Sequence, residues 1–125
     1  MSSTPIRDYR DLLAWQRAMD LALECEHVAR GIPAHATHVA TQVRRCALSV
    51  PANIAEGNGR FSRPDYLRHL SIANGSLREL ESHLHFVRRA YGATDALDRA
   101  ENLTLHTTKL LAGLVRGLRG TRKAG

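Results

Sequence analysis

The chain has 125 residues, the length of one domain, and its hydrophobic content of 43% is enough for a core without disulfides or metals. No apolar run approaches the roughly 20 residues of a membrane span, and the polar N-terminus lacks the apolar centre of a signal peptide, so we expect a soluble, cytoplasmic protein with no membrane partner. Sixteen of the 18 basic residues are Arg, against 12 acidic residues, which favours anionic partners because guanidinium groups pair with phosphate; a GC-rich genome would also favour Arg codons, whatever their use.

The first helix is predicted to start near residues 8–11 and to run to about Arg30. Gly31 and Pro33 then stop it, since Gly is favoured just past a helix end and Pro shortly after it. Its apolar residues recur at steps of three and four and so share one face. They are Leu12, Trp15, Met19, Ala22 and Leu23.

The second helix is predicted to start after His35 and to extend to about Gly57, followed by a loop over residues 57–61. Its apolar stripe consists of Val39, Val43, Cys46, Val50 and Ile54. Pro51 lies inside this stripe, where it costs roughly 3 kcal/mol in a regular helix. Because the apolar period continues past it, we predict a kink rather than an end.

The third helix is predicted to begin with a capping box formed by Ser62 and Asp65, with Pro64 tolerated in the first turn. Its core positions keep heptad spacing, the strongest periodic signal in the chain: Tyr66, Leu70, Ala73, Leu77, Leu80, Leu84, Val87 and Tyr91. Gly75 interrupts the helix at a cost of about 1 kcal/mol relative to Ala. We expect a close approach of another helix to offset that cost.

Gly92 is predicted to end the third helix and Thr94 to cap a fourth, whose apolar stripe consists of Leu97, Leu103, Leu110 and Leu114. Short loops between helices of about 20 residues make neighbouring helices antiparallel. The predicted fold is therefore all-α, an antiparallel up-and-down four-helix bundle. It covers residues 8–118, between a flexible N-terminus at 1–7 and a flexible basic tail at 119–125.

A polar stripe runs beside the apolar stripe of the second helix, at steps of three and four residues: Gln42, Arg45, Ser49, Asn53, Glu56 and Arg60. On the third helix, Ser76 and Glu79 lie one turn apart. Ser and Asn are weak formers of a solvent-facing surface, because their side chains compete with helical hydrogen bonds. We therefore predict a polar seam, within or between subunits, formed by Gln42, Ser49, Asn53, Glu56, Ser76 and Glu79; a solvated face and a catalytic site are the alternatives.

Helical bundles often hold metal ions between their helices. A carboxylate-bridged di-iron centre needs two Glu-x-x-His pairs, and the chain supplies one such pair in its first helix, Glu24 with His27. Glu79 with His83 has the four-residue spacing of an ion pair. The sequence therefore predicts no metal site and no cofactor.

Catalytic motifs are equally lacking. The sequence has no nucleophile elbow and no glycine-rich phosphate loop, because the Gly57–Arg60 turn follows a helix rather than a strand. Cys25 and Cys46 fall on different predicted helices, in apolar company and without a C-x-x-C or zinc spacing, which favours two structural core residues over a redox pair. We therefore predict no catalytic residues and no enzyme activity.

The run QVRRCALSVPANIAEG, residues 42–57, resembles the signature of a bacterial four-helix-bundle family that includes proteins encoded in intervening sequences of large-subunit ribosomal RNA genes. Two further segments match, within residues 11–16 and over residues 73–81, so that the resemblance spans roughly residues 8–118. The residues that stand where the family's motif has them are Arg44, Arg45, Ser49, Asn53, Glu56, Gly57 and Arg60.

This resemblance implies a cytosolic bundle that assembles into a ring, typically of five subunits. A related member, the accessory protein of diversity-generating retroelements, works with a reverse transcriptase and binds nucleic acid. We therefore predict a homopentamer without enzyme activity that binds RNA or DNA as an accessory factor; the rival hypothesis is a protein–protein assembly scaffold. The candidate phosphate-binding residues are Arg44, Arg45, Arg60, Arg63, Arg88, Arg89, Arg116 and Arg119.

Overall fold

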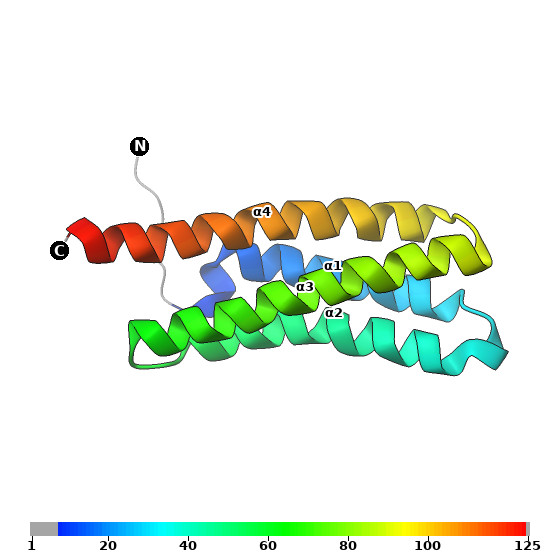
Figure 1. Cartoon of the computed structure of the whole chain (residues 1–125), viewed down its shortest axis with the longest axis horizontal. Coiled ribbons are helices and arrows are strands. Elements are labelled where there is room, and N and C mark those ends of the chain that lie inside the picture. The colour runs from blue at the N-terminus through cyan, green and yellow to red at the C-terminus, as the bar shows by residue number, and fades with distance from the viewer. Residues whose placement is uncertain (1–7, 125) are drawn as a thin grey trace.

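A computed structural model describes residues 8–124 of the chain, and within them it contains helices and no strands (Figure 1). A short 3₁₀ helix, η1 (Tyr9–Asp11), precedes α1 (Leu13–Arg30), and a second one, η2 (Ala34–Ala36), precedes α2 (Thr37–Asn58). The two remaining helices are α3 (Arg63–Tyr91) and α4 (Asp95–Ala124).

The four long helices lie side by side and alternate in direction, as the colours of Figure 1 show. Helix α2 packs against α1 and α3, and α4 packs against α1 and α3. The predicted antiparallel up-and-down four-helix bundle is confirmed. No helix among the described residues is long and apolar enough to cross a membrane.

Two of the predicted helix starts depend on side-chain caps that are present in the structure. Ser62 Oγ accepts a hydrogen bond from the Asp65 amide at 3.2 Å, and Thr94 Oγ1 accepts one from the Leu97 amide at 3.1 Å. Gly92 ends α3 with a positive φ of 94°, a conformation that glycine adopts without strain. Gly92 and Thr94 fix the turn between α3 and α4, and Ser62 fixes the start of α3.

The heptad of α3 forms the centre of the core. Its middle residues, from Leu70 to Val87, are buried, whereas Tyr66 and Tyr91 at the two ends are half-buried. Helix α2 continues through Pro51, which is itself buried. The core is mostly aliphatic, in keeping with the low aromatic content of the sequence.

Helices α2 and α3 approach each other closely at Gly57. A Cβ atom added there would lie 2.8 Å from His69 Cβ and 3.0 Å from Tyr66 Cδ1, so only glycine fits. The expected close approach at Gly75 is wrong, because a Cβ atom there would have no neighbour within 4 Å. The exposed backbone of Gly75 therefore has no packing role in the described part of the chain.

Helix α4 is longer than predicted. It continues to Ala124, past residue 118, the predicted end of the bundle. Residues 116–124 contain Gly117 and Gly120 among several basic residues, a composition typical of a frayed tail. The predicted flexible segment at residues 1–7 lies outside the described residues, as does Gly125.

Candidate functional site

Polar side chains of α2 and α3 meet in the partly buried contact between these two helices. Ser49 Oγ of α2 lies 2.7 Å from Ser76 Oγ of α3, a short hydroxyl–hydroxyl hydrogen bond between the two helices. Asn53 lies one turn along α2 and donates from Nδ2 to the Ser49 carbonyl at 2.9 Å and to Ser49 Oγ at 3.1 Å. Three members of the predicted polar seam thus contact one another within a single chain.

A histidine that the sequence analysis did not single out completes this group. His69 of α3 is buried, and its Nδ1 lies 3.1 Å from Asn53 Oδ1. Its Nε2 has no hydrogen-bond partner among the described residues and lies 3.8 Å from Glu56 Oε2. The sequence contains one indication of its burial: His69 lies three residues after Tyr66, on the apolar face of the heptad. It is not an apolar residue, so the apolar pattern alone does not identify it. We call Ser49, Asn53, His69 and Ser76 the Asn53 network.

The other members of the predicted polar seam lie outside the Asn53 network. Glu56 is half-exposed and forms an ion pair with Arg60 at 2.7 Å rather than with Arg45. Gln42 accepts a hydrogen bond from Arg45 at 2.6 Å. The polar stripe on α2 therefore has two parts. Ser49 and Asn53 belong to the Asn53 network, whereas the Glu56–Arg60 and Gln42–Arg45 pairs face solvent.

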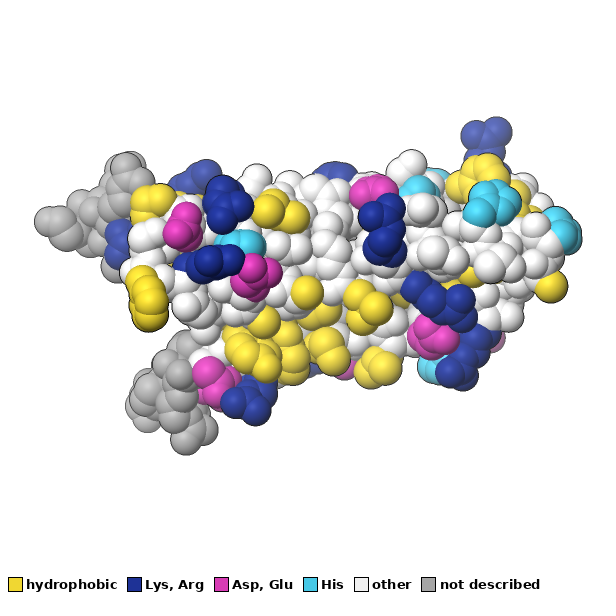
Figure 2. Space-filling view, turned by 90° about the horizontal axis from the view of Figure 1, so that it is seen from below, with side chains coloured by type: hydrophobic (Ala, Val, Ile, Leu, Met, Phe, Trp, Pro, Cys, Tyr) yellow, Lys and Arg dark blue, Asp and Glu magenta, His cyan; other side chains and the backbone are white. Residues whose placement is uncertain are grey.

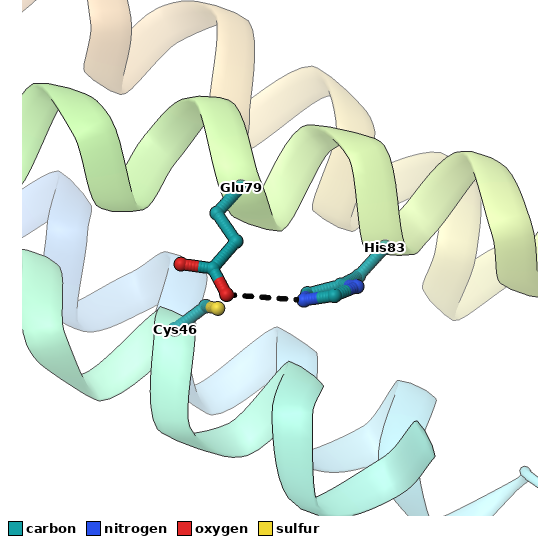
Figure 3. Close-up of side chains that lie close together, drawn as sticks. All are labelled: Cys46, Glu79 and His83. Atoms are coloured by element: carbon teal, nitrogen blue, oxygen red, sulfur yellow. Dashed lines mark hydrogen bonds and ion pairs between the residues drawn. The ribbon is translucent and has the colours of Figure 1, made fainter.

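Glu79, also predicted in the seam, lies beside Cys46 of α2 and His83 of α3, as Figure 3 shows. Glu79 Oε2 and His83 Nε2 are 3.4 Å apart. Burial, reinforced by the neighbouring Glu79 carboxylate, raises the pKa of the Cys46 thiol to about 11. Hydrogen bonds from Cys46 and then His83 lower the pKa of Glu79.

The other cysteine differs in its surroundings. Cys25 is fully buried, and burial raises the pKa of its thiol to about 12. No histidine joins it in a potential metal-binding group among the described residues. It is a small core residue, in keeping with the structural role expected for it from the sequence.

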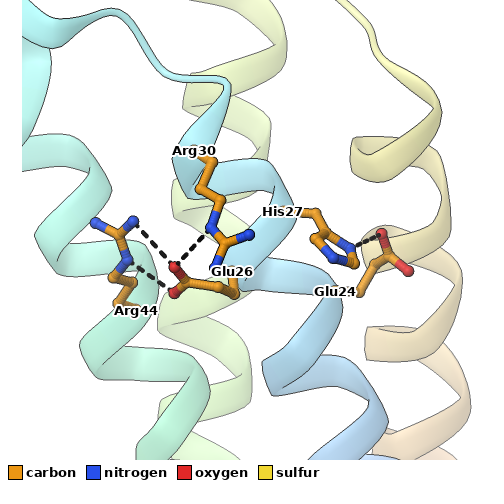
Figure 4. A network of polar contacts seen from close by, with 5 residues as sticks. All are labelled: Glu24, Glu26, His27, Arg30 and Arg44. Carbon is orange, nitrogen blue, oxygen red and sulfur yellow. Dashed lines mark hydrogen bonds and ion pairs between the residues drawn. The ribbon is translucent and has the colours of Figure 1, made fainter.

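Several of the candidate arginines are occupied by carboxylates of the same chain. Arg44 of α2 donates from Nε and Nη2 to the two oxygens of Glu26 on α1, at 2.9 and 3.2 Å, and Arg30 contacts the same carboxylate (Figure 4). Hydrogen bonding to Arg44 lowers the pKa of Glu26. This pairing joins α1 to α2 and leaves Arg44 little capacity for another anion.

Arg88 is paired twice across the α3–α4 turn. Its Nη2 lies 2.6 Å from Asp98 Oδ1 and 2.7 Å from Glu101 Oε1. The hydrogen bonds to Glu101 and Asp98 raise the pKa of the Arg88 guanidinium. Three candidate arginines therefore have carboxylate partners: Arg44, Arg60 and Arg88. Arg45 instead donates a hydrogen bond to the side-chain amide of Gln42.

The remaining candidates form no ion pair with any residue from 8 to 120, the part of the chain whose side chains are described. They are Arg63, Arg89, Arg116 and Arg119. Arg116 and Arg119 are exposed on the C-terminal half of α4, and Arg63 begins α3 at the same end of the bundle (Figure 1). Arg89 lies near the opposite end, beside the exposed Phe86.

A groove between α3 and α4 brings two of these arginines together. Its volume is about 340 Å³, and Arg116 and Arg119 line it with the polar side chains of Ser71 and Asn74. The other lining residues are Leu67, Leu70, Leu111, Ala112 and Val115. We call it the cationic groove; it combines apolar surface with two guanidinium groups that have no carboxylate partner among residues 8–120.

The surface also exposes large apolar side chains. Figure 2 shows hydrophobic side chains gathered in one area of the face on which α2 lies. Across the described surface, the exposed large hydrophobic residues include Leu23 of α1, Leu48 of α2 and Leu105 of α4, each more than half exposed. A contiguous apolar area such as that in Figure 2 commonly marks a contact with another protein.

Comparison with known proteins identifies the chain's relatives. The sequence model of a family described as 23S rRNA-intervening sequence protein matches residues 10–113. A solved structure of a protein of unknown function from the S23 ribosomal protein family of Bacteroides thetaiotaomicron superposes with a TM-score of 0.75. The two chains are 22% identical, and the match covers 82% of this chain and 98% of the other. No curated protein matches the chain.

Proposed function

The chain belongs to the family of 23S rRNA-intervening sequence proteins, and from this premise we propose that it is a non-enzymatic bundle that assembles with copies of itself and binds RNA or DNA. The bound strand lies against the arginines that have no internal partner. The relation to the accessory protein of diversity-generating retroelements stays a prediction from the sequence.

The unequal pairing of the arginines supports this proposal most strongly. When a guanidinium is paired with a carboxylate, as Arg44 is with Glu26, two of its N–H groups already donate to the carboxylate oxygens. Arg116 and Arg119 keep their donors, and both line one groove. Such a pair suits a phosphate backbone, whose charges repeat along the strand.

The chemistry of the cationic groove favours binding without sequence preference. Phosphate contacts fix the position of a strand but carry no direct base information. The apolar side chains of Leu67 and Val115 in the same groove offer contact to a sugar or a base. The paired arginines are expected to contribute only to the long-range field.

A titration of fluorescently labelled single-stranded RNA and DNA into the protein tests this function. Binding at low salt should weaken steeply towards physiological salt, because neutralised phosphates release counterions. Arg119→Ala should lower the slope of log affinity against log salt by roughly one. The matched control is Arg78→Ala, which removes an exposed arginine already paired with Glu81 at 3.1 Å and should leave the slope nearly unchanged.

The apolar surface favours assembly as the second part of the proposal. Exposed Leu23 and Leu48 offer area that a contact between copies would bury. We expect a pentamer, as the family resemblance implies. Light scattering coupled to size exclusion should give about five times the chain mass of 13.8 kDa, and a monomer at all concentrations would contradict the assembly.

The same exposed apolar residues favour a second candidate function, an assembly scaffold whose partner is another protein. In that case the basic charge is incidental and no salt-dependent titration curve appears. Failure of wild-type protein to bind either nucleic acid at low salt would therefore favour the scaffold.

A further inference from the structure

We propose that Cys46, Glu79 and His83 form a zinc-binding site on the α2–α3 face of the bundle. The three side chains come from two helices, and their potential ligand atoms all lie within 4.8 Å of one another. Figure 3 shows the Cys46 sulfur, a Glu79 oxygen and the His83 ring nitrogen pointing towards a common space. This site is separate from the cationic groove and does not depend on nucleic-acid binding.

The spacing of the three atoms fits a tetrahedral ion after a small adjustment. Bonds of about 2.0–2.3 Å from zinc to nitrogen, oxygen and sulfur put neighbouring ligand atoms about 3.4–3.7 Å apart. Glu79 Oε2 and His83 Nε2 are already 3.4 Å apart. The longest separation, at most 4.8 Å, has to shorten by about 1 Å, which side-chain rotation of the half-exposed His83 and exposed Glu79 allows.

The helical spacing brings two of the ligands together without strain. Residues four apart in a helix lie on the same face, the arrangement by which helical zinc motifs present two ligands. Cys46 supplies the third ligand from the facing helix. A hydrogen bond from Cys46 and an ion pair with His83 hold the Glu79 carboxylate between the two other potential ligands.

The ligand types select the metal. Thiolate and imidazole favour zinc and related transition metals, whereas magnesium and calcium prefer all-oxygen sites. When zinc binds, the Cys46 thiol gives up its proton to solvent and a zinc–sulfur bond forms. The thiolate and the Glu79 carboxylate then balance the two positive charges of the ion.

The surroundings leave a fourth position open. Cys46 and Glu79 line a pocket of about 160 Å³ together with Arg45, Ser49 and Ser76. None of these three neighbours is a preferred zinc ligand, so a water molecule is expected at the fourth position. The Arg45 guanidinium favours an anion there when one is present in solution.

Cobalt(II) titration of the full-length protein tests the site, because cobalt occupies zinc sites and reports a thiolate ligand by its charge-transfer absorption in the near ultraviolet. We expect that band to saturate at one cobalt per chain and to disappear when zinc is added. Cys46→Ala should abolish the band. His83→Ala should weaken cobalt binding by at least roughly tenfold, as loss of a metal-site contact generally does.

Two matched controls use the same residue types elsewhere in the bundle. Cys25→Ala removes the other thiol, and His27→Ala removes a histidine that contacts Glu24 at 3.3 Å with no thiol in a metal-binding group (Figure 4). Both variants should keep the band and the affinity. Absence of the band in wild-type protein would overturn the proposal, as would its survival in Cys46→Ala. An unchanged cobalt affinity in His83→Ala would also overturn it. His83 is partly exposed, so this variant is expected to fold.

Discussion

Two regions of the bundle use polar residues in opposite ways. Between α2 and α3, the side chains of the Asn53 network form hydrogen bonds with one another; His69 is buried and the other three members are partly buried. On the C-terminal half of α4, Arg116 and Arg119 line an open groove and form no ion pair with residues 8–120. In the first region, the polar groups form hydrogen bonds that hold two helices together. In the second, the guanidinium groups can donate hydrogen bonds to a ligand.

This difference separates stability from binding along the chain. Removing a member of a buried network leaves its partner without a hydrogen bond, which destabilises the fold. Removing an exposed arginine without a partner changes stability little but changes the field that a phosphate meets. Substitutions in the two regions should therefore produce different kinds of defect.

The largest effect on stability is expected from Gly57→Ala, at the α2–α3 contact. The added Cβ would lie 2.8 Å from His69 Cβ and 3.2 Å from the Tyr66 carbonyl oxygen, so the helices must move apart. We expect a loss at the upper end of about 1–3 kcal/mol in the free energy of unfolding. Thermal and urea denaturation measure it.

Gly75→Ala is the matched control, because it adds the same methyl group to α3 where no atom lies within 4 Å. It should stabilise the protein by about 0.4–1 kcal/mol by restricting the unfolded chain. Equal losses in both glycine variants would show that helix geometry, and not the α2–α3 approach, decides the outcome.

The next largest effect is expected from Asn53→Ala. This change removes the acceptor for His69 Nδ1 and the donor to Ser49, leaving a buried imidazole with neither nitrogen bonded within the described chain. We expect destabilisation by about 1–2 kcal/mol. Glu56→Ala, three residues away and half-exposed, should change stability by at most about 0.5 kcal/mol. Denaturation midpoints compare the two variants, and a Glu56→Ala loss as large as that of Asn53→Ala would break the distinction.

A smaller effect is expected from the Arg99–Glu24 pair of α4 and α1, whose atoms are 3.1 Å apart. The hydrogen bond from Arg99 lowers the pKa of Glu24 below its ordinary value of 4.5. The pair therefore stabilises the fold above that value, and its contribution is lost as the pH falls through the lowered pKa. Wild-type protein should melt slightly higher than Arg99→Ala at neutral pH, and the difference should shrink in acid; a difference that grows in acid would contradict this pairing.

Much of the fold could be predicted from the sequence, because its signals are local. The heptad of α3, the Ser62 and Thr94 caps and the Gly92 stop each depend on residues within a few positions of one another. The same dependence on local signals explains why the predicted end of α4, near residue 118, is too early. Gly117 and Gly120 lower helix propensity locally, whereas the structure continues the helix past both.

The candidate site was less accessible to sequence reasoning, because its members meet only in three dimensions. Ser49 and Asn53 could be selected by their spacing, but their partner His69 lies on another helix in an apolar period. Cys46 was assigned to the core from its stripe, and nothing in its own helix indicates Glu79 and His83 beside it. Likewise, the sequence gives the candidate arginines but not their pairing, which depends on carboxylates distant in the chain; Glu26, for example, is 18 residues from Arg44.

The separation of binding from stability is tested most directly by measuring both properties in the same two variants, the arginine double variant and Asn53→Ala. Nucleic-acid binding is titrated well below the melting temperature of each variant, and the melting temperature is measured separately. Arg116→Ala/Arg119→Ala should lower the salt slope of binding by roughly two while leaving the melting temperature almost unchanged. Asn53→Ala should lower the melting temperature and leave the slope unchanged. An arginine double variant with the wild-type slope, or wild-type protein that binds no strand at low salt, would contradict the claim that unpaired arginines on α4 form the binding surface.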